Sequence, residues 1–258
     1  MARDRESDLA AWGDVPELVR KIRARTPARL LAGRSGAAYR TSTQMELREA
    51  HAAARDAVRQ EMEIGSIFDS AFVSEWNLFE VETEAANKHE YLMRPDLGRR
   101  FSADSIAVIR QNCPSNSDLQ IAIGDGLSVP AVATQVPGLL PLICAGAQQR
   151  GWTVGRTFVI RHCRVGILNE IGEVLRPRVA LLLIGERPGL ATADSLSAYM
   201  AHRPKTGDTD ANRNLISNIH SRGLHSQAAA ERILNLAQQM TNAGTSGYIL
   251  REEPRSLH

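Results

Sequence analysis

The feature that most constrains the fold is a regular alternation of apolar and amphipathic segments between residues 102 and 186. Residues 119–125, 156–163 and 179–186 are mostly apolar runs of strand length, and the last of them reads VALLLIGE. Segments with apolar residues at helical spacing separate them, at residues 102–113, 137–151 and 168–176. Apolar strands joined by amphipathic helices indicate a mainly parallel sheet with helices on both faces. We therefore predict an α/β fold of Rossmann-like type.

Shorter segments on both sides of this alternation are predicted to extend the sheet. Residues 77–83 and 91–95 are interpreted as a hairpin or as two separate short strands. Further along the chain, residues 195–204 predict another strand and residues 224–240 a strongly amphipathic helix. Residues 246–250 are expected to close the sheet as a last strand.

The beginning of the chain has a different, helical character. Asp14 can cap a first helix, which Pro27 ends. The helix predicted at residues 45–62 is rich in Ala and carries few large apolar side chains. Such a helix does not build a thick core alone. We therefore expect residues 1–62 to form a helical segment that docks on a partner, and residues 63–258 to form an α/β domain.

Composition excludes several classes of protein. The formal net charge of +2 comes from nearly balanced signs, so it suggests neither binding to nucleic acid nor an acidic tail. Cys113, Cys144 and Cys163 lack the spacing of a zinc site or of a disulfide framework, and fit a reducing cytoplasm. No apolar run approaches the ~18–20 residues of a membrane span. We expect a soluble, intracellular protein.

The motifs of common nucleotide-binding and hydrolytic sites are missing from the sequence. It has no GxGxxG after a strand, no phosphate-loop lysine and no GxSxG. The nearest glycine-rich strand end is IGDGLSVP, residues 123–130, where Asp125 stands at the end of a predicted strand. Gly and Asp at such a place favour a plain turn. No complete catalytic set is present, which favours a ligand-binding or subunit domain over an independent enzyme.

Two groups of charged residues can be interpreted either as ordinary solvent-exposed charges or as functional residues. Glu186 and Arg187 directly follow a predicted buried strand. They are either a solvated ion pair or a ligand-facing strand end, because open α/β sheets bind ligands beyond the carboxyl ends of their strands. Asp96, Arg99 and Arg100 are either a capped helix start with solvated arginines or a contact for an anion or a partner protein.

Several sequence blocks, taken together and in order, resemble the small subunit of ethanolamine ammonia-lyase. The resemblance extends from about residue 26 to about residue 250. Its most specific combination is RPDLGRR, DGLS, GERPGL and SNIH. The other blocks are TPARLLAGRSG, EAHAAARDAV, RVGILNEIGEVL, SLSAYMAHRP and NRNLISNIHSRG.

This resemblance implies a chain that is inactive alone and works with a large subunit. In that family the large subunit is a TIM-like barrel that holds the substrate and most catalytic groups, and six large and six small subunits assemble. The holoenzyme uses adenosylcobalamin, bound base-on between subunits, to convert ethanolamine into acetaldehyde and ammonia by radical chemistry. Catalytic residues are accordingly expected on the large subunit, and no residue of this chain is expected to ligate a metal.

The resemblance also implies which residues of this chain contact cobalamin. By motif they are Val165, Glu186 and Leu215, the last at a position where better-known members carry Cys. A carboxylate such as Glu186 suits the amide N–H groups of the corrin rim, since charge-assisted hydrogen bonds are the stronger kind. His220 lies in NIHSRG, which is similar to a cobalt-ligating loop of other proteins, but base-on binding leaves it no such role.

Two alternatives from other classes stay open on the sequence alone. The first is a non-catalytic α/β regulatory or scaffold module that binds a nucleotide-like ligand, and the second is an independent small-molecule enzyme. We expect a cytoplasmic location. The family resemblance adds the inside of a bacterial microcompartment as an alternative, although the long leader associated with packaging is not found ahead of the first predicted helix.

Overall fold

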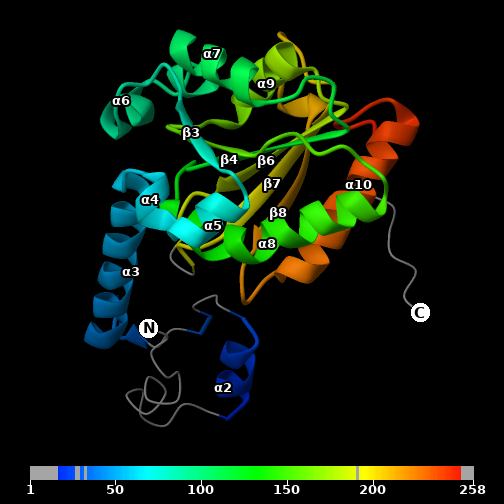
Figure 1. The fold of residues 1–258 in the computed structure, drawn as a ribbon. Coiled ribbons are helices and arrows are strands. Elements are labelled where there is room, and N and C mark those ends of the chain that lie inside the picture. The colour runs from blue at the N-terminus through cyan, green and yellow to red at the C-terminus, as the bar shows by residue number, and fades with distance from the viewer. Residues whose placement is uncertain (1–16, 27–29, 32–33, 190–191, 251–258) are drawn as a thin grey trace, which may run out of the picture.

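A computed structural model describes residues 17–26, 30–31, 34–189 and 192–250 (Figure 1). The α-helices are α2 (Glu17–Ala24), α3 (Thr41–Arg59), α4 (Ile64–Ile67), α5 (Ser70–Glu75), α6 (Lys88–Met93), α7 (Ala103–Asn112), α8 (Val129–Gln149), α9 (Leu168–Leu175) and α10 (Ser226–Ala243). The strands are β1 (Arg34–Ser35), β2 (Ala38–Tyr39), β3 (Phe79–Glu82), β4 (Leu119–Gly124), β5 (Phe158–Arg161), β6 (Val179–Gly185), β7 (Leu196–His202) and β8 (Asn214–Ile219). Short 3-10 turns lie at η1 (Leu97–Arg99), η2 (Val165–Ile167) and η3 (Asp210–Asn212).

The main sheet has six strands in the order β3-β5-β4-β6-β7-β8. The first four run parallel to one another, whereas β7 and β8 are antiparallel. The predicted α/β fold with a mainly parallel sheet is thus confirmed. Counted along the chain, this order is 1-3-2-4-5-6 and differs from the 3-2-1-4-5-6 of the dinucleotide-binding fold, so the Rossmann-like arrangement is not confirmed.

The uniform apolarity of the central strands follows from burial on both of their faces. Along β6, Val179, Leu181 and Leu183 belong to one core cluster together with α8 and α10. The intervening residues, Ala180, Leu182 and Ile184, belong to a second cluster together with α7 and α9. Figure 1 shows these two pairs of helices on opposite sides of the sheet. Helices therefore cover both faces of the parallel part, as predicted.

The antiparallel strands β7 and β8 are packed on one face only. Leu196, Ala198 and Met200 of β7 contribute to the core under α10. Tyr199 points to the opposite face, where it is half-buried, and its neighbour across the ladder is Leu215 of β8, which is 46% exposed. The second helical layer thus ends near β6, and part of the sheet beyond it remains accessible.

The interpretation of residues 77–83 and 91–95 as paired strands is wrong. Residues 79–82 do form β3, but β3 pairs with β5, and residues 91–93 belong to α6. The Asn87 side chain accepts a hydrogen bond from the Glu90 N–H, and the Glu90 carboxylate accepts one from the Ala86 N–H. This reciprocal cap begins a helix, and N-x-x-E is the signal that could have predicted it.

Helix α8 begins at Val129, well before the predicted start at residue 137, and runs through Pro137 and Pro141. The stabilisation that α8 gains by packing against the sheet and α10 exceeds the cost of the helix hydrogen bonds that the prolines remove. By length and composition alone α8 could cross a membrane, with a mean hydropathy of 1.5 over an 18-residue window, of which 56% is buried in the body. The expectation that no segment approaches the length of a span therefore needs correction for α8, although its burial is that of a core helix.

Other predicted elements have mixed outcomes. The strand at 195–204 and the helix at 224–240 are confirmed as β7 and α10. The last strand, β8, was not predicted, and residues 246–250 form turns instead of closing the sheet. Asn214 explains the latter, because its side chain bonds Gly247 and Leu250 and thereby holds this segment as a loop.

Helices α2 and α3 precede the α/β body, and Figure 1 shows α3 extending away from the sheet. Only Thr43 and Ala57 of α3 are buried. The two predicted N-terminal helices are confirmed for residues 17–24 and 41–59, while Asp14 and Pro27 lie outside the described residues. The boundary between segments 1–62 and 63–258 stays a prediction.

Two glycines inside helices give a direct test of the packing. A Cβ at Gly172 of α9 would lie 1.7 Å from the Pro204 carbonyl oxygen, whereas one at Gly138 of α8 would meet nothing nearer than 3.5 Å. We expect Gly172→Ala to lower the free energy of unfolding by about 1–3 kcal/mol through overpacking. Gly138→Ala, as the matched control, should raise it by about 0.5–1 kcal/mol. Urea denaturation of both variants measures the difference, and equal effects would contradict the packing of α9 on Pro204.

Candidate functional site

A cleft lies where the parallel strands end and the antiparallel strands begin. It consists of two adjoining hollows of about 790 and 300 Å³. Arg164, Val165, Tyr199 and Leu215 line both hollows. The residues that follow β4, β5 and β6 form one side of the smaller hollow, and side chains of β7 and β8 form its floor. This is the place where open α/β sheets bind ligands.

The structure brings together the three residues that the sequence analysis selected. Val165 begins η2 shortly after β5, Glu186 directly follows β6, and Leu215 belongs to β8. All three line the smaller hollow. Val165 and Glu186 thus occupy strand ends, whereas Leu215 lies within an edge strand and offers an exposed apolar side chain.

Glu186 is held in place by neighbouring strands and not by Arg187. Its Oε1 accepts hydrogen bonds from the Ser197 hydroxyl at 2.6 Å and from the Asn218 N–H at 2.8 Å. Within the described part of the chain, Glu186 makes no ion pair with Arg187. The interpretation as a solvated Glu186–Arg187 pair is therefore wrong. The anchored Oε1 fixes the carboxylate and leaves Oε2 without a protein partner among those residues.

The larger hollow has charged walls of both signs. Asp96, Arg99 and Arg100 all line it, together with Arg164 and Arg213. The acidic side chains around it are Asp96, Glu170, Asp208 and Asp210. Asp96 pairs with Arg94 at 2.7 Å and does not cap a helix, because the cap of α7 is Ser102. The interpretation of this cluster as a capped helix start is wrong for Asp96, and contact with an anion or partner stays a prediction.

His220 has a structural role in the turn after β8. It is 3% exposed, its Nε2 lies 2.7 Å from Asn218 Oδ1, and its Nδ1 accepts the Arg222 N–H at 3.2 Å. Since Nδ1 accepts, Nε2 carries the proton and donates to Asn218. Both ring nitrogens are thus occupied inside the turn whose Asn218 N–H binds Glu186.

Asp125 is a buried charged residue beside the cleft, which the sequence pattern indicates only as part of a turn. The predicted turn at 123–130 is present, yet Asp125 is completely buried and pairs with Lys88 at 2.6 Å. Its Oδ1 accepts the backbone N–H of Cys163 at 2.7 Å. Burial and the Asp125 charge together raise the pKa of the Cys163 thiol well above its usual value. Removing one partner of a buried ion pair typically costs about 3–5 kcal/mol, so neither Asp125 nor Lys88 is expected to tolerate neutralisation of the other alone.

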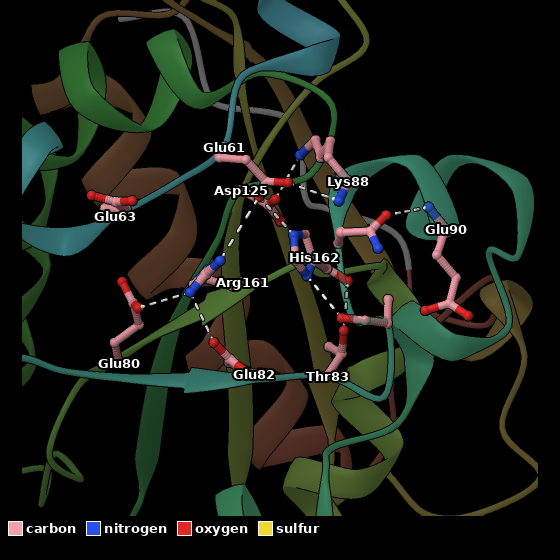
Figure 2. A network of polar contacts seen from close by, with 12 residues as sticks. Glu61, Glu63, Glu80, Glu82, Thr83, Lys88, Glu90, Asp125, Arg161 and His162 are labelled. Carbon is pink, nitrogen blue, oxygen red and sulfur yellow. Dashed lines mark hydrogen bonds and ion pairs between the residues drawn. The ribbon is translucent and has the colours of Figure 1, made fainter.

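A second network joins the end of α3 to the same segment (Figure 2). The buried His162 ring contacts the Ala85 carbonyl oxygen through Nδ1 at 2.9 Å and Glu61 Oε2 through Nε2 at 2.7 Å. A carbonyl only accepts, so Nδ1 donates to Ala85, and Nε2 faces the Glu61 carboxylate. Glu61 Oε1 also accepts the Lys88 N–H at 2.8 Å. Burial raises the pKa of Glu61, but the hydrogen bonds from His162 and Lys88 outweigh it and leave that pKa below its ordinary value.

Arg161 and Glu80 complete this network at the sheet edge. Arg161 pairs with Glu82 at 2.8 Å and approaches Glu80 at 3.8 Å. The Glu80 carboxylate accepts the Ile64 N–H at 2.9 Å, and burial raises its pKa. The chain after α3 is thereby fastened to β3 and β5 at Glu61 and at Ile64.

Comparison with known proteins identifies the family. A family model described as ethanolamine ammonia-lyase light chain (EutC) matches residues 16–251. An ethanolamine ammonia-lyase small subunit of Clostridium perfringens is 41% identical over 231 residues, covering 90% of this chain and 76% of the relative. That of Clostridium acetobutylicum is 37% identical over 246 residues, covering 95% and 99%. That of Listeria monocytogenes is 40% identical over 231 residues, covering 90% and 77%.

The chain belongs to the ethanolamine ammonia-lyase small-subunit family. The resemblance inferred from the sequence blocks is confirmed, and the chain is a component of a lyase. In this small subunit, the block DGLS contains the turn at Asp125, GERPGL contains Glu186, and NRNLISNIHSRG contains β8 with the His220 turn. The most specific blocks of the sequence therefore surround the cleft.

The Glu61–His162 pair predicts a loss of stability in acid. Because the folded-state pKa of Glu61 is depressed, its contribution is fully present above the ordinary value of 4.5 and is lost as pH falls through the depressed value. In Glu61→Gln this contribution is absent. We therefore expect the variant to be less stable than the unmodified small subunit near neutral pH, and the gap to close in acid. Urea denaturation at several pH values measures it.

Glu63→Gln is the matched control for this measurement. Glu63 lies two residues further on, no dashed line joins it to the network in Figure 2, and the substitution removes the same charge. It should leave stability nearly unchanged at every pH. A gap for Glu61→Gln that is constant with pH would contradict the role of its carboxylate charge.

Proposed function

We propose that this small subunit forms one wall of an adenosylcobalamin site in an ethanolamine ammonia-lyase that it assembles with a large subunit. The observation that carries the proposal is the convergence of Val165, Glu186 and Leu215 on one hollow at the carboxyl ends of the strands. Bound adenosylcobalamin supplies the radical chemistry by which ethanolamine is converted into acetaldehyde and ammonia. This chain binds and orients the cofactor, and the large subunit carries the catalytic groups.

The side chains of the cleft fit the chemistry of a corrin. Val165 and Leu215 offer apolar contact, and Tyr199 lies between the two hollows. The fixed carboxylate of Glu186 has one oxygen free of protein partners among the described residues. That oxygen can accept from an amide N–H of the corrin rim, a charge-assisted hydrogen bond.

The histidines beside the cleft support base-on binding. His162 and His220 are both buried, and each has both ring nitrogens engaged by protein groups. Neither offers a free nitrogen to cobalt. The cofactor's own base is therefore proposed as the lower ligand, as the resemblance described in the sequence analysis also implies.

The proposed partner is a large subunit, in a complex of six large and six small subunits. The helix α3 carries an apolar stripe, Leu47, Ala50, Ala54 and Val58, whose members are only half-buried in this chain. A helix face of this kind gains stability when a neighbour completes its burial. We propose that the segment 1–62 docks on the large subunit through this stripe.

Glu186→Gln tests the cofactor site. Glutamine keeps an oxygen for Ser197 and Asn218 but replaces the free carboxylate oxygen with an amide that donates. We expect the Kd for adenosylcobalamin, titrated into the assembled complex, to rise about ten- to a hundredfold, since a hydrogen bond to a charged group contributes about 1.5–3 kcal/mol. Glu75→Gln, an exposed glutamate on α5, is the charge-matched control and should bind as the unmodified complex does. An unchanged Kd for Glu186→Gln would contradict the proposed contact.

Ala50→Arg tests the docking of α3, with Ala52→Arg as its control on the same helix. Ala50 lies within the half-buried stripe, whereas Ala52 is exposed on the opposite face of the helix. We expect Ala50→Arg to weaken association with the large subunit about tenfold or more, as for a residue at the centre of an interface. Sedimentation analysis of mixed subunits measures it. Equal effects of the two substitutions would argue against this stripe as the docking face.

A further inference from the structure

The segment Cys163–Val165 leaves the sheet directly after β5, and its backbone groups are bound by residues from several other elements. His162, which directly precedes this segment, has a backbone φ of +56°. This value lies in the left-handed region, which residues other than glycine rarely adopt. The Thr83 hydroxyl donates to the His162 carbonyl at 3.1 Å, and the Arg164 N–H donates to the Gly98 carbonyl at 2.8 Å. Between these two bonds, the backbone N–H of Cys163 is bound by the Asp125 carboxylate.

Asp125 uses both carboxylate oxygens, one for this N–H and the other for Lys88. Figure 2 shows Asp125 beside Lys88. Lys88 also donates to the Gly126 carbonyl at 3.2 Å. The Tyr91 hydroxyl lies 2.8 Å from that same carbonyl and 3.0 Å from the Cys163 carbonyl. The peptide groups on both sides of Cys163 are therefore bound by one buried cluster, which consists of Asp125, directly after β4, and of Lys88 and Tyr91 from α6.

This cluster adjoins the cleft, and its Tyr91 lines the smaller hollow. Gly126, Cys163, Arg164 and Val165 line the smaller hollow, whereas Asp125 and Lys88 do not. A movement of the Cys163 peptide would displace Arg164 and Val165, which line both hollows. Burying two charges is costly, and a pair of apolar residues of similar volume would often be at least as stable. Fold stability alone therefore does not explain why an ion pair is buried at this place. The hydrogen bond from the Cys163 N–H to the Asp125 carboxylate offers a reason.

We infer that Asp125 is a positioning residue for the cofactor, which fixes the Cys163–Val165 wall of the cleft through the Cys163 N–H, with Lys88 as its buried counter-ion. This inference rests on the proposed cofactor site. It adds a residue that touches no ligand and acts through the backbone of the segment that does.

The test compares two double variants of the small subunit in complex with the large subunit. Lys88→Met/Asp125→Ala removes both charges together with the acceptor for the Cys163 N–H. Lys88→Met/Asp125→Asn also removes both charges but retains an oxygen that can accept this N–H. The two double variants therefore differ in whether the Cys163 N–H has an acceptor, and neither variant leaves an unpaired charge buried. Gln120→Met, at the opposite end of β4, is the control for loss of a buried polar side chain far from the cleft.

Two quantities are measured on each complex: hydrogen exchange of residues 161–167, and the Kd for adenosylcobalamin. We expect faster exchange and a Kd raised about tenfold in the Ala variant, because one buried hydrogen bond that orders the wall is lost. The Asn variant should restore both quantities toward the unmodified complex. Gln120→Met should lower the unfolding temperature without changing either.

The outcomes separate this inference from the proposed function. If the Ala and Asn variants bind equally, whether tightly or weakly, the Cys163 hydrogen bond does not position the wall and the inference is wrong. If only exchange changes, the segment is loosened without consequence for the cofactor, and the inference is again wrong. Should Glu186→Gln weaken binding in that case, the cofactor site still stands. Should neither Glu186→Gln nor the Ala variant affect binding, the proposed cofactor site fails as well.

Discussion

The structure depends on the complete burial of the central strands on both of their faces. Along β4 and β6 every residue is buried, and odd and even positions face two different cores. Such strands have little room for charge, because an ionised group in an apolar core is very costly unless it is paired. The polar side chains therefore gather where the strands end, and Asp125 and Glu186 are each the first residue beyond their strand. The site follows from the same packing that stabilises the sheet.

A cleft is present because the sheet extends beyond its second helical layer. The connection from β6 to β7 contains no described helix, and a short connection favours an antiparallel neighbour over a parallel crossover. β7 and β8 consequently widen the sheet without bringing a helix to the face that carries Tyr199 and Leu215. That accessible face becomes the floor of the two hollows, while α10 covers the other face.

The sequence predicts those parts of the fold in which each residue's environment is decided locally. β4, β5 and β6 are apolar at nearly every position and were predicted, as were Val165 and Glu186, which follow two of these strands. β8 was not predicted, because Ser217 and Asn218 are exposed and a bulge interrupts its pairing with β7. A strand that is half-exposed and irregular carries no clear period.

The role proposed for Asp125 could not be predicted from the sequence, because its partners come from distant parts of the chain. Lys88 is 37 residues before it and Cys163 is 38 residues after it. From the sequence alone, a Gly-Asp-Gly turn with a buried Asp cannot be distinguished from one whose Asp is exposed to solvent. Only tertiary packing brings a lysine next to the Asp. Lys88 lies between the two segments that the sequence analysis interprets as strands, so the helix α6 that carries it was not predicted.

The contacts of His162 link the two proposed surfaces of this small subunit. Glu61 follows the helix α3, whose stripe is proposed to dock on the large subunit, and it is bound to His162. His162 directly precedes Cys163, whose N–H Asp125 binds beside the cleft. A displacement of the end of α3 would reach Glu61 first. Through the bond between Glu61 and His162, it would then reach the segment that lines the cleft. The segment from His162 to Val165 therefore lies between the helix that is proposed to dock on the large subunit and the cleft that is proposed to bind the cofactor.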